Sequence, residues 1–384
     1  MTAASFMGYT GFTVAMPFLP LFIGQLGVTD VGQISMWTGL SLGVTPGLTA
    51  LLAPVWGRLG DRFGRKIMVE RSLVSFVVLF AAMAYVTRAW HVLAIRIVQG
   101  LFAGYGSLSV AMAAESAPRD RMPNAIGTVQ TAQRIGPAVG PVVGGVLAAL
   151  VGLRRAFVVT ALFYGVALVI VHGMYDDAAI HATPVDAAET GRVSFRNVLA
   201  FQNFVLMMGV IFGLQFVDRS FGPVLPLWVE QMGAAHDRVP LVSGVLFSVM
   251  AFTGALGHHF CGKLLRVYSS RVVIAGGAAI AALGAGLFGA SGIFWIMCVA
   301  SVLLGLGIGA AMTASFSAAG AVIPPGAHGA AFGVLTSASL VGMASSPFIA
   351  GFVGGASLRV VFFVDLALMG LLAAWVARTM TDHR

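Results

Sequence analysis

The stretch Gly57-Arg-Leu-Gly-Asp61-Arg62-Phe-Gly64-Arg65-Lys66 is the densest patch of charge in a chain with only 9% charged residues. Apolar runs border it on both sides. A charged side chain inside membrane hydrocarbon costs several kcal/mol, so we expect the stretch to form a short polar loop between two membrane helices. Gly57 and Gly64 would let the backbone turn tightly and the helix ends approach closely. A basic loop alone would need Lys and Arg, but not an Asp and two glycines at these spacings.

The composition excludes a soluble domain. The chain is 58% hydrophobic with a mean hydropathy of +0.93, whereas soluble domains are about 45–50% apolar and about 25% charged. A membrane helix takes about 20 residues, so the 384 residues leave room for twelve spans with short loops. The net charge of +8 comes from basic residues spread over the predicted loops. It therefore indicates orientation and gives no reason to expect a nucleic-acid partner.

The predicted fold class is an all-α polytopic membrane protein with twelve transmembrane helices in two six-helix bundles. The spans run over residues 3–25, 33–56, 67–87, 91–114, 122–150, 156–175, 201–228, 241–262, 271–290, 293–318, 329–353 and 358–378. The longest polar segment, 176–200, lies between the sixth and seventh spans. We therefore expect an N-terminal bundle over 1–175, a cytoplasmic linker over 176–200 and a C-terminal bundle over 201–384.

Loop charge predicts the orientation. If the 57–66 stretch is inside, the inner segments contain 14 Lys and Arg and the outer segments contain five. The positive-inside rule then places both termini in the cytoplasm of a multi-pass protein of the cell (inner) membrane. The amino terminus has no positive n-region and no cleavage site, so we expect Met1 onward to belong to the mature protein rather than to a signal peptide.

The two halves repeat. The segment Met16-Pro-Phe-Leu-Pro-Leu-Phe-Ile-Gly-Gln-Leu-Gly27 matches Gly222-Pro-Val-Leu-Pro-Leu-Trp-Val-Glu-Gln-Met-Gly233 at an offset of 206 residues. A duplicated unit with an even number of spans gives parallel halves related by an axis along the membrane normal. The 57–66 stretch has decayed in the second copy, 262–271, which contains no Asp.

The 57–66 stretch resembles motif A of the major facilitator superfamily, G-x-L-x-D-R-x-G-R-K. Every fixed position is present, namely Gly57, Asp61, Arg62, Gly64, Arg65 and Lys66. The resemblance implies a gating latch in which Asp61 docks at the cytoplasmic end of span 11 while Arg65 reaches Glu115, at the inner end of span 4. These contacts would exist only when the inner side is closed. The alternative for Glu115 is an isolated acid at the membrane interface.

Two further motifs match the same superfamily. Arg96 shares a helix face with Gln99 in span 4 and looks like motif B, which implies a role in proton transfer; the alternative is an arginine that snorkels to the outer interface. A run in span 5 resembles motif C, the signature of the antiporter branch, because its four-residue glycine spacing favours close helix packing and its prolines bend the span. The motif C residues are Gly136, Pro137, Gly140, Pro141, Gly144 and Gly145.

The combined resemblance covers nearly the whole chain, which looks most like MdtG-type multidrug efflux carriers of the drug:proton antiporter branch. Several such antiporters have an acidic residue in span 1, but residues 3–25 contain none. Proton coupling would then depend on the other charged residues within the spans. These are Asp218, Arg96, Arg134, Arg219 and Asp365.

Among these charges we expect Asp218 to bind the proton. With Trp228 as an anchor at the interface, Asp218 lies about 15 Å deep at about 1.5 Å per residue. The alternative is a static buried pair of Asp218 with Arg134 or Arg219.

The predicted function is proton-coupled export of lipophilic drugs by alternating access, with small lipophilic molecules, protons and the lipid bilayer as partners. The alternative is a carrier for a specific metabolite or amphipathic anion, which the extra cations favour. The sequence contains no G-x-x-x-x-G-K-[ST] loop, and no H-E-x-x-H or G-x-S-x-G at a usable depth. We therefore expect an ion gradient as the energy source, no enzyme activity, no cofactor and no metal, in a monomer. The residues expected to line the substrate cavity are Phe12, Met16, Gln99, Phe212, Gln215, Phe216 and Met312.

Overall fold

The computed structural model describes residues 1–116, 121–175, 203–323 and 328–381, and within these ranges the chain is helical without strands. The first half contains α1 (Thr2–Ala15), the 3₁₀ turn η1 (Met16–Phe18), α2 (Leu19–Gln25), α3 (Val31–Phe63), α4 (Arg65–Met83), α5 (Ala89–Leu101), α6 (Tyr105–Glu115), α7 (Met122–Val151) and α8 (Leu153–Met174). The second half contains α10 (Phe204–Gln231), α11 (Val239–Val267), α12 (Ser270–Ala290), α13 (Phe294–Val322), α14 (His328–Ala356) and α15 (Leu358–Thr379).

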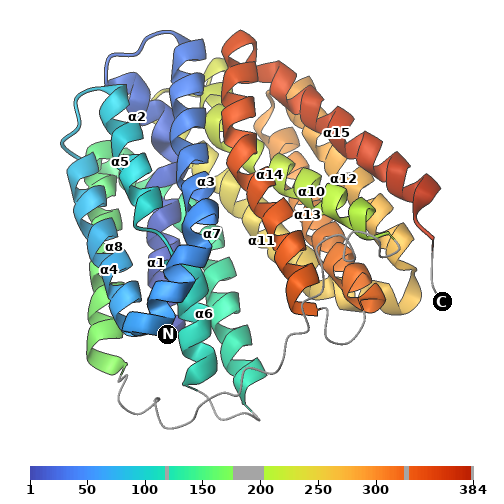
Figure 1. Cartoon of the computed structure of the whole chain (residues 1–384). Helices are drawn as coiled ribbons and strands as arrows, with labels where there is room; N and C mark the ends of the chain where they lie inside the picture. The colour runs from blue at the N-terminus through green and yellow to red at the C-terminus, as the bar shows by residue number, and fades with distance from the viewer. Residues whose placement is uncertain (117–120, 176–202, 324–327, 382–384) are drawn as a thin grey trace.

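The helices confirm the predicted fold class. Ten helical segments in the described ranges are long and apolar enough to cross a membrane, and α5 is a shorter apolar helix. Figure 1 shows the blue-to-green helices of the first half beside the yellow-to-red helices of the second half. We call the end with the Gly57–Lys66 stretch the motif A end, and the end with the turn between α2 and α3 the far end.

Two of the predicted continuous spans are broken. Span 1, expected over 3–25, is interrupted by η1, where Pro17 has no N–H to continue the helix. Span 4, expected over 91–114, stops at Leu101 and restarts at Tyr105, because Gly104 adopts φ 130°, a conformation that favours glycine. Hydropathy reports how apolar a segment is and not whether its backbone is continuous, so these breaks were not predicted.

The expected polar loop at 57–66 is mostly helix. Helix α3 continues through Phe63, and Gly64, with φ 91° and ψ 137°, alone separates it from α4. The 33 residues of α3 extend about 50 Å at about 1.5 Å per residue, well beyond the ~30 Å hydrocarbon core, so its charged last turns can reach water while still helical. Gly64 makes the predicted turn, whereas Gly57 lies inside the helix, where an added Cβ would meet nothing within 4 Å.

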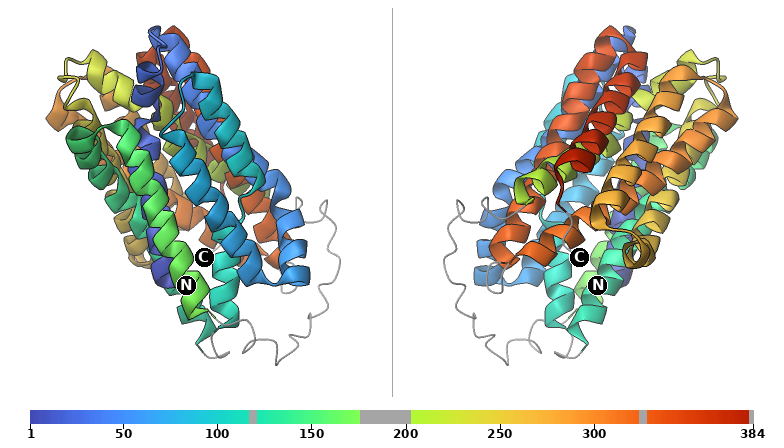
Figure 2. Two further views of the ribbon diagram at one scale, coloured as in Figure 1. Left: turned by 90° about the vertical axis from the view of Figure 1, so that its left-hand side faces the viewer. Right: turned by 90° about the vertical axis from the view of Figure 1, so that its right-hand side faces the viewer.

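The two halves meet along two helix pairs, α3 with α14 and α7 with α11. At the first seam, a Cβ added to Gly32 would lie 2.7 Å from the carbonyl oxygen of Gly355. At the second, a Cβ added to Gly145 would lie 2.7 Å from the carbonyl oxygen of Pro240. These contacts lie in the far-end halves of the helices, and the two halves diverge toward the motif A end in Figure 1. Figure 2 shows each half from its outer side.

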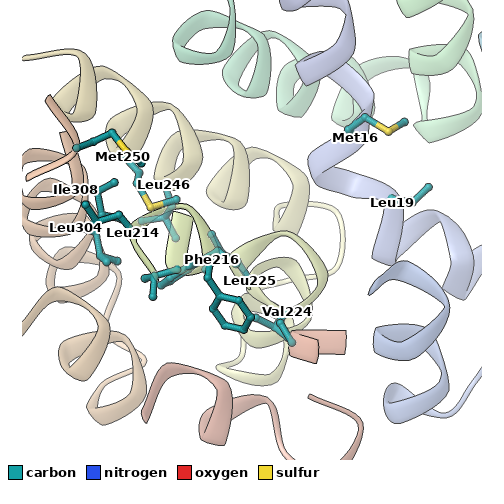
Figure 3. Packing of buried hydrophobic residues seen from close by; sticks show 14 of the residues in the cluster. Met16, Leu19, Leu214, Phe216, Val224, Leu225, Leu246, Met250, Leu304 and Ile308 are labelled. Carbon is teal, nitrogen blue, oxygen red and sulfur yellow. The ribbon is translucent and has the colours of Figure 1, made fainter. Parts of the chain in front are cut away.

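Apolar side chains fill the interior of each half. Figure 3 shows Leu214 of α10 beside Leu246 of α11 and Leu304 of α13, all buried. Nearer the far end, the Phe221 ring of α10 lies 5.1 Å from that of Phe288 on α12 and 5.3 Å from that of Phe362 on α15 between ring centroids, so an aromatic cluster joins these three helices. Aromatic rings also pack inside the first half, where Phe22 lies 4.7 Å from Phe157 between ring centroids.

Candidate transport site

Arg96 lies inside the first half and does not snorkel to the interface. Its side chain is 1% exposed, and its Nε donates to the carbonyl oxygen of Ser41 on α3 at 2.9 Å. Its Nη1 donates to Gln99, the motif B partner on the same helix face. The Thr45 hydroxyl donates in turn to the Arg96 carbonyl at 2.7 Å, and the guanidinium lies 5.6 Å from the centre of the Phe12 ring. This cation is therefore held by dipoles and a ring, and no described acid pairs with it.

Asp218 and Arg219 form an ion pair in the middle of α10. Arg219 Nε lies 3.2 Å from Asp218 Oδ2, and the two side chains are 45% and 35% exposed, respectively. Most of their neighbours on α10 are buried. Gly222, one helical turn after Asp218, would place an added Cβ 3.0 Å from Leu42 of α3, so this face of α10 points toward the first half. The pairing of Asp218 with Arg219 that this alternative expected is present, but both side chains are partly accessible rather than buried.

The depth of Asp218 follows from the helix and not from Trp228. Trp228 is 2% exposed, with its ring 5.5 Å from that of Phe362, so it is a core residue and not the expected interface anchor. Asp218 lies 14 residues after Phe204 and 13 before Gln231, the two ends of α10. It is therefore about 20 Å from either end at about 1.5 Å per residue, at the middle of the apolar span Phe204–Gln231.

Asp365 is a second acid in the same half, and its side chain is 0% exposed. Its Oδ2 accepts a hydrogen bond from the Ser220 hydroxyl at 2.5 Å, and its Oδ1 has no hydrogen-bond partner among the described residues. Ser220 directly follows the Asp218–Arg219 pair on α10. Asp365 of α15 thus contacts α10 next to the ion pair, but it is buried whereas the pair is accessible.

Arg134 lies at the seam between α7 and α11. It shares a helix face with Pro141 and Gly145, both of which contact α11. Its side chain is exposed and makes no ion pair or hydrogen bond within the described ranges. It is close enough to His258 of α11 for an electrostatic interaction, and His258 Nδ1 lies 2.6 Å from the hydroxyl of Thr313 on α13.

The residues expected to line the substrate cavity fall into two groups. Phe12, Phe212 and Gln215 are partly exposed, as lining side chains should be. The remaining four, Met16, Gln99, Phe216 and Met312, are between 2% and 8% exposed. Figure 3 shows Met16 on the first half and Phe216 on the second. This group packs into the walls of the two halves in this conformation.

The glycines of motif C face α1. An added Cβ would lie 2.8 Å from the Thr10 backbone nitrogen at Gly136 and 2.8 Å from the Thr10 carbonyl oxygen at Gly140, and at Gly144 it would meet the Val14 carbonyl. The predicted smooth face for close packing is therefore present. Pro137 and Pro141 lie inside a helix that continues through both, and Gly145 contacts α11 instead.

The motif A side chains are only partly described. Lys66 donates to the carbonyl oxygen of Tyr175 at the end of α8 at 2.5 Å, and Arg62 is exposed beside the Phe63 ring. The side chains of Asp61 and Glu115 lie outside the described residues, so the predicted docking of Asp61 and the contact between Arg65 and Glu115 remain predictions.

With this geometry established, comparison with known proteins shows the family. The model of the Major Facilitator Superfamily matches residues 1–288 and 240–383. The chain belongs to the Major Facilitator Superfamily. Two solved structures share the fold of this superfamily member. One is a bacterial homolog of the human lysosomal transporter Spinster in an inward-facing, unoccupied conformation, with a TM-score of 0.80, 15% identity, and 99% and 96% of the two chains covered. The other is a D-xylose-proton symporter, with a TM-score of 0.76, 15% identity and the same coverage.

Curated relatives of this chain are named as multidrug resistance proteins. This chain is 30% identical over 269 residues to a multi-drug resistance efflux pump PmrA homolog of Lactococcus lactis, covering 69% of this chain and 65% of that protein. It is 31% identical over 262 residues to the multidrug resistance protein MdtG of Dickeya zeae, covering 67% and 63%. The match therefore spans somewhat less than two thirds of the length of these relatives.

Sequence reasoning missed the polar partners of the charges in this superfamily member. The backbone carbonyl of Ser41 accepts from the Arg96 guanidinium, the Thr45 hydroxyl donates to the Arg96 backbone carbonyl, and the Ser220 hydroxyl donates to Asp365. Serine and threonine inside apolar spans are a weak signal, because they also bond to their own helix. Ser220 does so as well, to the Val217 carbonyl oxygen at 2.9 Å. Only the packing of neighbouring helices reveals which of them serve a charge.

Proposed function

We propose that this chain is a proton-coupled secondary transporter that exports lipophilic compounds by alternating access. The observation that carries the proposal is the accessible Asp218–Arg219 pair in the middle of α10, facing the other half of a major facilitator fold. An ionisable residue at mid-membrane is expensive and usually functional. The names of the relatives, a multi-drug resistance efflux pump and a multidrug resistance protein, support drugs as substrates. We infer no catalytic role, and we expect the transporter to act as a monomer.

We further propose that the motif A end is cytoplasmic, with both termini on that side of the inner membrane. The excess of basic residues in the segments at this end supports this orientation. Residues 1–175 and 201–384 would then be the two moving halves, joined by a cytoplasmic linker over 176–200. Because the halves meet at the far end, this conformation would be open to the cytoplasm and ready to accept a substrate.

Each charged residue has a proposed role in the cycle. A proton from the outside binds Asp218 and removes its charge, which breaks the ion pair with Arg219; release of that proton to the cytoplasm restores the pair. Substrate and proton would then alternate at this position. Asp365 is the second candidate, because burying an ionised carboxylate without a cation is costly. Arg96 would orient the first half through Ser41 and Gln99, and Asp61, Arg65 and Glu115 would latch the closed inner side.

The test uses purified protein in liposomes with an imposed pH gradient and ethidium, a fluorescent lipophilic cation. Wild type should accumulate ethidium against its gradient. Asp218→Asn should abolish this accumulation while ethidium still binds, and that binding should no longer depend on pH. Glu230→Gln is the matched control, since Glu230 is an acid on the same helix that pairs with His236 near the far end. Accumulation by Asp218→Asn at the wild-type rate would assign Asp218 a structural role.

A second candidate function is transport of an amphipathic anion. Arg134 is accessible and carries no described ion pair, while the charge of Arg219 is balanced by Asp218. An unbalanced cation attracts an anionic group and repels lipophilic cations. If this candidate is correct, the lipophilic anion anilinonaphthalene sulfonate should be transported in preference to ethidium, and Arg134→Gln should weaken its binding. Transport of ethidium alone would reject it.

A further inference from the structure

The break in span 4 leaves two carbonyl groups that a neighbouring helix satisfies. In a continuous helix, the carbonyls of Phe102 and Ala103 would accept from the amides four residues later. Here Nη2 of Arg71 on α4 donates to the Phe102 carbonyl at 3.1 Å and to the Ala103 carbonyl at 3.2 Å. Freed carbonyls within a membrane need such donors. Arg71 therefore replaces bonds that would otherwise straighten the span.

A tryptophan from a third helix holds this arginine. The Arg71 guanidinium carbon lies 3.6 Å from the centre of the Trp56 ring, a close cation–π contact, with Trp56 on α3. The same indole borders the bend itself, because a Cβ added to Gly104 would lie 3.6 Å from Cβ of Trp56. Arg71 of α4 and Trp56 of α3 thus both contact the bend.

The position of these two residues links the bend to motif A. Trp56 directly precedes Gly57, the first residue of motif A, and Arg71 follows Lys66, its last residue, by five positions. Beyond the bend, α6 leads to the motif A end, and Leu108 of α6 lies 3.2 Å from a Cβ built on Gly60. A movement of motif A would therefore move both Trp56 and Arg71.

We propose that Arg71 and Trp56 form a clamp that holds span 4 bent and so positions α6 for the conformation in which the motif A end is open. Loss of the clamp frees the Phe102 and Ala103 carbonyls to bond within the span, which straightens it and moves α6. Arg71 acts through α6 and touches no substrate, so it is a positioning residue. Its purpose rests on the proposed transport cycle, but its effect on the conformation needs neither substrate nor proton gradient to be measured.

The chain provides a matched control at the far end. Arg154 of α8 donates through Nη1 to the carbonyls of Ala84 and Val86, at 2.8 and 2.9 Å. Its guanidinium lies 5.6 Å from the Phe22 ring. Arg154 thus makes the same kind of contacts as Arg71, but at the end of α4 and not at a bend within a span. Replacing it removes equivalent bonds without affecting span 4.

The experiment measures the distance between spin labels at Ser116→Cys, after α6, and Ala321→Cys, near the end of α13, both exposed positions. The experiment uses the full chain in which Cys261 and Cys298 have been replaced, reconstituted in nanodiscs without substrate. Arg71→Met should raise the ratio of short to long distances by about tenfold, the scale expected for losing hydrogen bonds from a charged group. Arg154→Met should leave the ratio as in wild type.

A second variant keeps the proposal testable if Arg71→Met fails to fold. Trp56→Leu removes the ring and should shift the same distribution in the same direction, whereas Trp56→Phe retains a ring and should shift it less. An unchanged distribution in the folded variants, or an equal shift in Arg154→Met, would overturn the clamp. Failure of proton-driven ethidium transport would instead reject the proposed function and leave the clamp intact.

Discussion

Gly43 and Gly47 lie about one turn apart on α3, and both face Ala344 of α14, which makes them a matched pair for testing how the halves close. A Cβ added to Gly43 would lie 2.6 Å from the Ala344 carbonyl oxygen, whereas one added to Gly47 would lie 3.6 Å from the Ala344 Cβ. The first must recede by 0.8 Å to reach ordinary contact at 3.4 Å, and the second is already there. The Cα of Gly43 and the carbonyl oxygen of Ala344 both belong to helix backbone, so neither atom can move without moving its helix.

Gly43→Ala should therefore destabilise the closed far end by about 1–3 kcal/mol, the usual cost of overpacking. That cost applies only while α3 and α14 are in contact, so it shifts the populations of the two conformations by about 5- to 150-fold. Gly47→Ala should shift them little.

The assay uses Ser35→Cys, a 0% exposed position on the same seam, in purified protein without Cys261 and Cys298. Gly43→Ala should raise its reaction rate with a bulky maleimide by the same factor, and Gly47→Ala should not. Equal rates in all three proteins would refute the view that glycine contacts at this seam decide closure.

Three further predictions concern packing, orientation and the second acid. Gly140→Ala places a Cβ 2.8 Å from the Thr10 carbonyl oxygen and should lower the free energy of unfolding by about 1–3 kcal/mol. Gly127→Ala, on the same helix, meets nothing within 4 Å and is the control. Equal melting temperatures of the two variants in detergent would count against the motif C packing. Ala235 is exposed at the far end and Tyr268 is exposed at the motif A end. A cysteine that replaces Ala235 should react with an impermeant thiol reagent added to intact cells, and a cysteine that replaces Tyr268 should not. The reverse pattern would invert the topology. Asp365→Asn retains the Ser220 contact and should preserve folding while slowing proton-driven transport less than Asp218→Asn; a greater loss in Asp365→Asn would make Asp365 the principal proton site.

The sequence predicted the membrane fold because that fold depends on the lengths of apolar runs. Runs of about 20 residues can only be spans, and all twelve predicted spans have helices in the structure. The turn at Gly64 was also predictable, because charge and glycine coincide there. The same reasoning failed for Gly57, because the length of α3 and not the local charge decides where the helix ends.

The breaks in spans 1 and 4 had signals that the sequence alone did not resolve. Pro17 and Pro20 are matched by Pro223 and Pro226 in the second half, yet α1 and α2 are separated by η1 while α10 is continuous. The same residues therefore break one helix and not the other, and the surrounding packing decides. Arg71 is one of the 14 basic residues counted in the inner segments, and the sequence predicted nothing more of it, since its acceptors appear only once span 4 is bent.

The site charges were predicted as a set, but not in their arrangement. Asp218 and Arg219 are neighbours in sequence, and the structure shows that they pair and are accessible. Arg96 was expected either to take part in transport or to snorkel, and its burial against Ser41 removes the second alternative. These outcomes depend on which helices pack together, which hydropathy does not encode.

The most direct test of the account is proton release from the purified transporter when a substrate binds. In weakly buffered detergent solutions over a range of pH, with a pH-sensitive dye, ethidium should release protons from wild type wherever Asp218 is protonated before binding, because a bound cation favours the ionised form of a carboxyl group. Asp218→Asn should bind ethidium without releasing protons. Ethidium binding to wild type with no proton release, or an unchanged release from Asp218→Asn, would contradict coupling at this residue.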